Sequence, residues 1–257
     1  GMSKVAEGWD VGIRFLSSPR TGEIDCSGIG FCDGTVSDRS SRDMFLVPNF
    51  SYVRKINERI RFGLSAYGNG GINTSYGQDF YVSSVALINN VPPPTRAKLG
   101  IDFSQLIFAP TLSYSLNDKH VLGIAPLLAV QKLSTRGLQA FAPLSAAPES
   151  LSNRGSAWSY GAGVRIGWLY QLNSKIQLGA AYASKIYMSK FDKYDGLLVN
   201  SGEFDIPSNF GFGLAIKIND RVDFAFDVVR ILYSDIDSLS NPVVTMAELG
   251  GVINPER

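Results

Sequence analysis

Apolar residues recur at every second position in many segments of this 257-residue chain. The clearest segment is 158–170, WSYGAGVRIGWLY, in which one face is aromatic or aliphatic and the other carries serine, glycine and Arg165. A repeat of two is the pattern of a β-strand that has one apolar face. Charge or small polar residues interrupt every apolar stretch before about 18 residues, the length that a membrane-spanning helix needs. The pattern therefore predicts an all-β protein.

Nine segments of the chain carry this alternation. They are 9–16, 44–55, 60–68, 104–116, 121–132, 158–170, 176–185, 210–218 and 222–232. In a soluble sandwich the apolar face points into the core, whereas in a membrane barrel it meets lipid and the polar or small face lines the lumen. Alternation alone is compatible with both architectures, so the connections between the strands have to separate them.

Short and long connections alternate strictly along the sequence. The short ones are the Asn-centred turns 56–59, 116–119, 172–175 and 218–221, and the long ones are 17–43, 69–103, 133–156 and 189–205. This arrangement gathers every long loop at one end, as in outer-membrane barrels with short periplasmic turns and long outer loops. Aromatic residues near both strand ends agree with membrane interfaces: Tyr52, Tyr114, Tyr170 and Trp158. The sequence predicts an antiparallel up-and-down transmembrane β-barrel.

Composition argues against several other classes of function. Charged residues make up 18% of the chain and the net charge is +1, so there is no basic surface that would indicate nucleic acid. The single histidine, His120, has no plausible catalytic or metal-binding set around it. We expect no enzyme activity, no metal and no cofactor.

Two cysteines lie close together in the first long connection. Cys26 and Cys32 flank a glycine-rich stretch, CSGIGFC. This spacing suits a small disulfide in an oxidising compartment, and the alternative is two free thiols.

Three stretches of the chain resemble the FadL/TodX family of outer-membrane transporters for long-chain fatty acids and aromatic hydrocarbons. They are 182–239, with DIPSNFGFGLA, NDR and AFDVVRILYSD, then YGNGGINTSY at 67–76 and SQLIFAPTLSY at 104–114. The resemblance implies a Gram-negative outer-membrane location, a monomer, about fourteen strands and an N-terminal hatch. Because about nine strands are found and the hatch is absent, we expect residues 1–257 to be a single barrel domain truncated at both ends.

Apolar residues in two of the long loops are candidates for capturing a hydrophobic ligand. They are Phe80, Tyr81, Val82, Val85, Leu87, Ile88, Leu138, Phe141 and Leu144. In the family that the chain resembles, the corresponding loops form an outer apolar groove. The alternative is that these loops pack on each other and cap the barrel.

Two further features concern the wall and the lumen of the barrel. The glycine-rich stretch Gly68, Asn69, Gly70 and Gly71 permits a bulge or kink, or a simple strand-to-loop junction. The family resemblance implies a gap in the wall there, through which ligand leaves sideways. Basic residues on polar strand faces could meet a carboxylate ligand or be satisfied by Asp223 and Asp227. They are Arg14, Arg61, Arg165, Lys185 and Lys217.

The function predicted from these features is transport of a hydrophobic compound across the outer membrane. The partners expected are a hydrophobic small molecule and outer-membrane lipid. A general diffusion porin or adhesin-like barrel is the alternative, although the apolar loops disfavour it, and a soluble β-sandwich binding module is the third.

Overall fold

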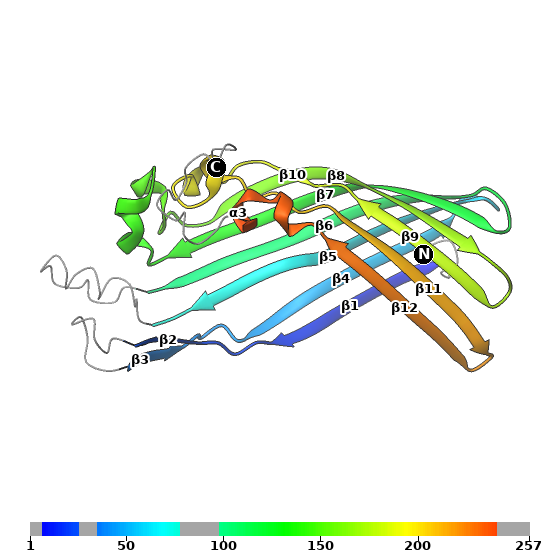
Figure 1. The fold of residues 1–257 in the computed structure, drawn as a ribbon, viewed down its shortest axis with the longest axis horizontal. Coiled ribbons are helices and arrows are strands. Elements are labelled where there is room, and N and C mark those ends of the chain that lie inside the picture. Colours follow the sequence, from blue (N-terminus) through cyan, green and yellow to red (C-terminus); the bar gives the residue numbers. More distant parts are fainter. Residues whose placement is uncertain (1–6, 26–34, 78–97, 241–257) are drawn as a thin grey trace, which may run out of the picture.

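The computed structural model describes residues 7–25, 35–77 and 98–240. Its main body is one antiparallel sheet in which each long strand pairs with the next one along the chain, so that the order is that of a meander (Figure 1). The nine long strands are β1 (Gly8–Ser17), β4 (Met44–Lys55), β5 (Ile60–Ser75), β6 (Gly100–Ser115), β7 (His120–Arg136), β8 (Ala157–Gln171), β9 (Ile176–Ala183), β11 (Asn209–Asn219) and β12 (Val222–Ile231). The sheet curls into part of a barrel, with β1 and β12 as its two edges in the described residues.

The four short connections lie together at one end of the sheet, which confirms the predicted topology (Figure 1). Three of them share one mechanism, in which an asparagine side chain replaces a backbone turn. The Oδ1 atoms of Asn57, Asn117 and Asn173 each accept hydrogen bonds from the backbone N–H groups two and three residues further on, at 2.8 to 3.0 Å. Asparagine favours such turns because its side chain can bond locally to the backbone.

Replacing Asn173 with alanine should destabilise the β8–β9 hairpin. Two hydrogen bonds to Oδ1, from the N–H groups of Lys175 and Ile176, are lost, at about 0.5–1.5 kcal/mol each. The check is urea-induced unfolding of the full-length protein in lipid vesicles, where Asn173→Ala should lower the midpoint. Ser174→Ala, one residue away and exposed, is the control, and equal midpoints for the two variants would contradict this account of the turn.

The two faces of the sheet differ in the direction that a membrane barrel requires. Along β7 the inward Leu127 is 1% exposed, whereas the outward Leu128 is 50% exposed. The same alternation continues on β8, where Tyr160, Ile166 and Trp168 are exposed. Large apolar side chains on the convex face are unsuited to water and suited to lipid, so the barrel interpretation is preferred over the sandwich. Across the described ranges, no helix is both long and apolar enough to span a membrane.

Several strands run further than the sequence pattern indicated. β5 continues through the glycine-rich stretch to Ser75, β6 begins at Gly100, and β7 reaches Arg136. These extensions pair with one another beyond the length that a membrane crossing needs, so an expectation of about ten residues per strand ended them too early. The connection 17–43 also contains a small hairpin, β2 (Thr21–Asp25) with β3 (Thr35–Arg39).

Candidate functional site

The outer loop predicted from the sequence at 189–205 instead packs, with its flanking residues, on the inward faces of the wall. This lumen segment, residues 184–208, contains β10 (Tyr187–Met188), a 3-10 turn η4 (Asp192–Tyr194) and a short helix α2 (Val199–Gly202). Two clusters of buried apolar side chains anchor it to the inward faces of the wall. The first cluster is Ile107, Ala109, Ala125, Leu127, Ala129, Ala183, Ile186, Met188 and Ile206, with Tyr67 packed against it. The second is Phe103, Leu133, Ala157, Phe191 and Tyr194.

Hydrogen bonds also join the lumen segment to residues of β7 and of the loop that follows it. The Tyr194 hydroxyl accepts a hydrogen bond from the Thr135 N–H at 3.1 Å and donates to the carbonyl oxygen of Gly155 at 2.5 Å. The buried Gln131 amide donates to the carbonyl oxygen of Phe204 at 3.1 Å. Because the buried Tyr194 hydroxyl and the Gln131 amide nitrogen find their hydrogen-bond partners across this contact, the segment is packed on the folded wall and is not a solvated loop.

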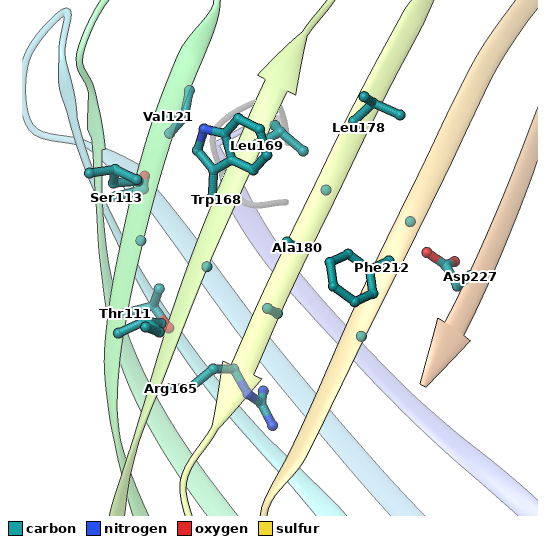
Figure 2. A pocket seen from close by; sticks show the side chains of 18 of the residues that line it. Thr111, Ser113, Val121, Arg165, Trp168, Leu169, Leu178, Ala180, Phe212 and Asp227 are labelled. Atoms are coloured by element: carbon teal, nitrogen blue, oxygen red, sulfur yellow. The ribbon is translucent and has the colours of Figure 1, made fainter. Parts of the chain in front are cut away.

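The inward faces below the lumen segment, toward the short turns, line an open cavity of about 730 Å³ (Figure 2). Glycine and alanine dominate its inward lining on β6 to β12, so the space exists because these side chains are small. The inward-facing glycines and alanines are Ala109, Gly123, Ala125, Gly167, Gly179, Ala181, Gly211, Gly213, Ala215 and Ala225. The polar lining includes Thr111, Ser113, Gln177 and Asp227. A compact solute or a further part of the protein could occupy such a space.

Arg165 lies between this cavity and the first apolar cluster. It lines the cavity from β8, and its guanidinium donates a hydrogen bond to the Tyr67 hydroxyl on β5 at 3.1 Å. The guanidinium carbon is also 6.0 Å from the centre of the Tyr67 ring. Since β6 and β7 separate these strands in the sheet, the pair spans the concave side of the wall. A cation held in this way can offer its remaining N–H groups to a carboxylate.

The other four cations proposed for the lumen have different surroundings. Lys217 forms an ion pair with Asp220 in the short turn at 2.8 Å. Lys185 lies beyond the end of β9, where its ammonium is 3.0 Å from the buried Asp205 carboxylate and rests over the Tyr187 ring. Arg14 and Arg61 occupy inward positions on β1 and β5, opposite Val47 and Ser113 in the register. Arg165 is the member of this set that lines the described cavity.

The wall is interrupted between β4 and β5. Pairing between these strands ends at Asn49 and Tyr67, and above this point Met44–Pro48 pair with β1 while Gly68 and Gly70–Ser75 pair with β6. Pro48 stands just beyond the last β4–β5 pair, and proline has no N–H to extend a ladder. The strands are joined again at the top, where the Ser41 N–H donates to the carbonyl oxygen of Ser75 at 2.9 Å. Between these limits the Arg20 guanidinium rests over the Phe45 ring of β4 and donates to the carbonyl oxygen of Asn73 on β5 at 2.9 Å. We call the stretch between these limits the lateral window.

The glycine-rich stretch forms one side of the lateral window. A register shift between Gly68 and Gly70 leaves Asn69 as the extra residue of a β-bulge, and the Asn69 amide donates to Gln105 at 3.1 Å. The glycines lie outside the left-handed region, so their role is close approach: a side chain on Gly71 would meet the Phe103 carbonyl oxygen at 3.2 Å. The bulge falls inside β5, which continues beyond it, and not at a strand-to-loop junction.

Part of the proposed capture surface lies in the described residues. Leu138 precedes a 3-10 helix, η2 (Gln139–Leu144), and the Phe141 N–H donates to the Leu138 carbonyl oxygen at 3.0 Å. Both side chains are half-buried. This loop contacts the lumen segment, because the Ser145 hydroxyl donates to the carbonyl oxygen of Gly196 at 2.6 Å. Leu144 closes the helix.

Several residues named from the sequence lie outside the described ranges. They are the two cysteines, Cys26 and Cys32, and the first-loop residues Phe80, Tyr81, Val82, Val85, Leu87 and Ile88. The sequence did not show that the lumen segment packs on the wall. It also did not identify Tyr67 as the partner of Arg165. The buried residues Ile186, Met188, Phe191 and Tyr194 are a signal that could have done so, since apolar residues in a long loop need a surface to cover them.

Solved structures with the same architecture support this geometry. The toluene transporter TodX of P. putida superposes with a TM-score of 0.65 at 20% identity, over 91% of this chain and 64% of that one. The Ralstonia pickettii toluene transporter TbuX gives 0.60 at 17% identity, covering 91% and 65%. A Pseudomonas aeruginosa FadL homologue gives 0.53 at 18% identity, covering 91% and 62%. The chain thus spans less than two thirds of the length of these structures, and at these identities the likeness shows the fold.

Comparison of the sequence with known families identifies the family of this chain. A search of curated proteins finds no significant match. Residues 23–254 match the family described as outer membrane protein transport protein (OMPP1/FadL/TodX), which agrees with the resemblance in the sequence and with an outer-membrane location. The chain therefore belongs to the OMPP1/FadL/TodX family of outer-membrane transport proteins.

Proposed function

We propose that this protein carries hydrophobic compounds, long-chain fatty acids or monoaromatic hydrocarbons, through the outer membrane and catalyses no reaction. The observation that supports the proposal is the lateral window, where β4 and β5 lack backbone pairing beside the apolar clusters of the lumen. Tyr67, at its lower limit, packs on the first cluster, and Ile72 pairs with Phe103 of the second. A hydrophobic solute that moved from lumen to lipid here would contact these apolar residues and would pass the Arg20 guanidinium between Phe45 and Asn73.

Capture would precede this step at the outer end of the barrel. Leu138 and Phe141, together with Leu144 and the apolar residues of the first long loop, would hold the solute before it enters. The exposed Met44 and Leu46 on β4 would receive it at the lipid side of the window. Apolar surface on both sides of an opening favours an apolar solute, because such a solute loses little free energy on leaving the pocket for the bilayer.

Uptake by cells tests this proposal directly. Cells that carry the full-length protein should accumulate labelled toluene or a labelled long-chain fatty acid faster than cells that lack it. A hydrophilic sugar of similar size serves as the comparison, because a general diffusion porin would admit it equally. The polar lining of the cavity, with Thr111 and Asp227, is the feature that favours the porin alternative. Sugar uptake equal to toluene uptake would select that alternative.

Arg165 should distinguish the two classes of hydrophobic substrate. A carboxylate gains a charge-assisted hydrogen bond from its guanidinium and toluene gains none, so Arg165→Met should slow fatty-acid uptake by about tenfold or more, from the 1.5–3 kcal/mol of such a bond. Toluene uptake should change little. Tyr67→Phe, which removes the hydroxyl that accepts from Arg165 but keeps the cation, is the matched control. An equal loss for both substrates in Arg165→Met would show that Arg165 supports the wall instead of the ligand.

A further inference from the structure

The outward face of the barrel changes from apolar to polar residues near its long-loop end. Inward and outward residues alternate on β7, so Lys132, Ser134 and Arg136 point outward while Gln131, Leu133 and Thr135 are buried. Lys132 stands opposite Trp158 of β8 in the register. Below this level the outward residues are apolar, among them Phe108, Leu128 and Tyr160, all exposed. Trp158, also exposed, therefore marks the boundary of the lipid-facing band, where tryptophan is typical.

Two cations are held on the outward face at and above this boundary. The Lys132 ammonium is 2.9 Å from the Asp102 carboxylate, and Asp102 in turn accepts from the Asn73 amide at 3.3 Å. The Arg136 guanidinium reaches across β6 and donates to the Ser75 hydroxyl at 3.3 Å. It passes over Gly100, where a side chain would lie 3.3 Å from one of its nitrogens. The missing side chain of Gly100 thus leaves room for the guanidinium against the wall.

The side chains of Lys132 and Arg136 are suited to bind a phosphorylated lipid headgroup. Arg136 has no carboxylate within ion-pairing distance in the described residues, and guanidinium groups bind phosphate oxygens in pairs. Lys132 and Arg136 are four residues apart on one strand face, which places their Cα atoms about 13 Å apart. The long-loop end of an outer-membrane barrel faces outward, so the lipid at this level belongs to the outer leaflet, whose glycolipid, lipopolysaccharide, carries phosphates on its lipid A.

We propose that Lys132 and Arg136 form a binding site for the phosphates of lipopolysaccharide on the outside of the wall, with Trp158 and the apolar band below it against the acyl chains. The site is separate from the transport route, since the inward and outward faces of β7 are opposite. The lipid would brace the outer ends of β5, β6 and β7. These ends hold one side of the lateral window.

Binding of defined lipid A species to the purified full-length protein tests the proposal. Native mass spectrometry and a fluorescence titration would measure diphosphoryl lipid A binding to the parent and to Lys132→Gln/Arg136→Gln. At about 1 kcal/mol per cation near a charged lipid surface, the double variant should bind roughly 30-fold more weakly. Lys119→Gln/Lys175→Gln makes the same charge change in the exposed short turns at the opposite end and should bind like the parent.

Three outcomes would overturn this site. The first is equal affinity of the parent and the Lys132→Gln/Arg136→Gln variant for diphosphoryl lipid A. The second is an equal loss in the Lys119→Gln/Lys175→Gln control, which would mean attraction by overall charge. The third is full competition by millimolar inorganic phosphate, which would mean a site for free anions. Toluene uptake by intact cells is measured in parallel, so that a failure of transport is seen separately from a failure of lipid binding.

Discussion

Uptake of hydrophobic compounds should stop when a disulfide joins residues 47 and 68 across the lateral window. A Cβ atom on Gly68 would lie 2.9 Å from Val47 Cγ1, which brings the two positions within the reach of a cysteine pair. The bond would hold β4 against β5 just above their last backbone pair, Asn49 with Tyr67. We expect Val47→Cys/Gly68→Cys, made in a background of Cys26→Ser and Cys32→Ser, to lose at least nine tenths of toluene uptake when oxidised and to recover it on reduction.

A second cysteine pair controls for the effect of a crosslink as such. Ala66 and Phe108 are partners in the regular part of the β5–β6 ladder and lie outside the cavity lining, so joining them closes no opening, and Ala66→Cys/Phe108→Cys should transport normally in both redox states. The measurement is labelled-toluene uptake by cells before and after reductant, with crosslinking followed by mass spectrometry. Full uptake by the oxidised 47–68 pair would remove the lateral route and leave an axial channel as the simpler account.

The bulge can be tested without cysteines. Gly70→Val/Gly71→Val places two β-branched side chains where one would meet the Phe103 carbonyl oxygen, and valine favours a regular extended strand. Ligand binding at the outer loops should persist, because Leu138 and Phe141 are untouched, whereas uptake should fall. Loss of both binding and uptake would place the defect in assembly and not in the window.

Truncation of Phe191, which anchors the lumen segment to the wall, should strongly lower the stability of the protein. Phe191 is 0% exposed and packs in the second apolar cluster, so Phe191→Ala should destabilise the protein by about 3–5 kcal/mol. Because the segment packs on the inward faces of β6, β7 and β8, its loosening should also admit solutes that the parent excludes. The outward Phe15, 74% exposed, supplies a matched control in Phe15→Ala.

Two measurements follow this variant. Urea unfolding in vesicles should show a lower midpoint for Phe191→Ala than for Phe15→Ala, and cells that express Phe191→Ala should become sensitive to a bulky hydrophilic antibiotic. A lower midpoint without increased permeability would mean that the segment anchors the wall but does not obstruct the lumen. An unchanged midpoint would contradict the burial of Phe191 as a source of stability.

The sequence by itself determined the architecture, because the signals for it are local. Alternation such as that of 158–170 specifies which face of a strand is apolar, and the asparagine turns specify where two strands join. Both properties depend on residues that are neighbours in the chain. The number, order and antiparallel pairing of the long strands therefore follow from the sequence.

Only the tertiary structure decided the contents of the lumen and the opening in its wall. Arg165 meets Tyr67 across 98 positions of sequence, and no local pattern encodes that distance. Phe191 and Tyr194 are buried by residues of β6, β7 and β8. Since those strands are distant in the sequence, the local pattern around Phe191 and Tyr194 indicates only a loop. The glycines at 68–71 permitted a bulge, but the window arises because β4 and β5 stop pairing at Asn49 and Tyr67, which is a property of two strands together.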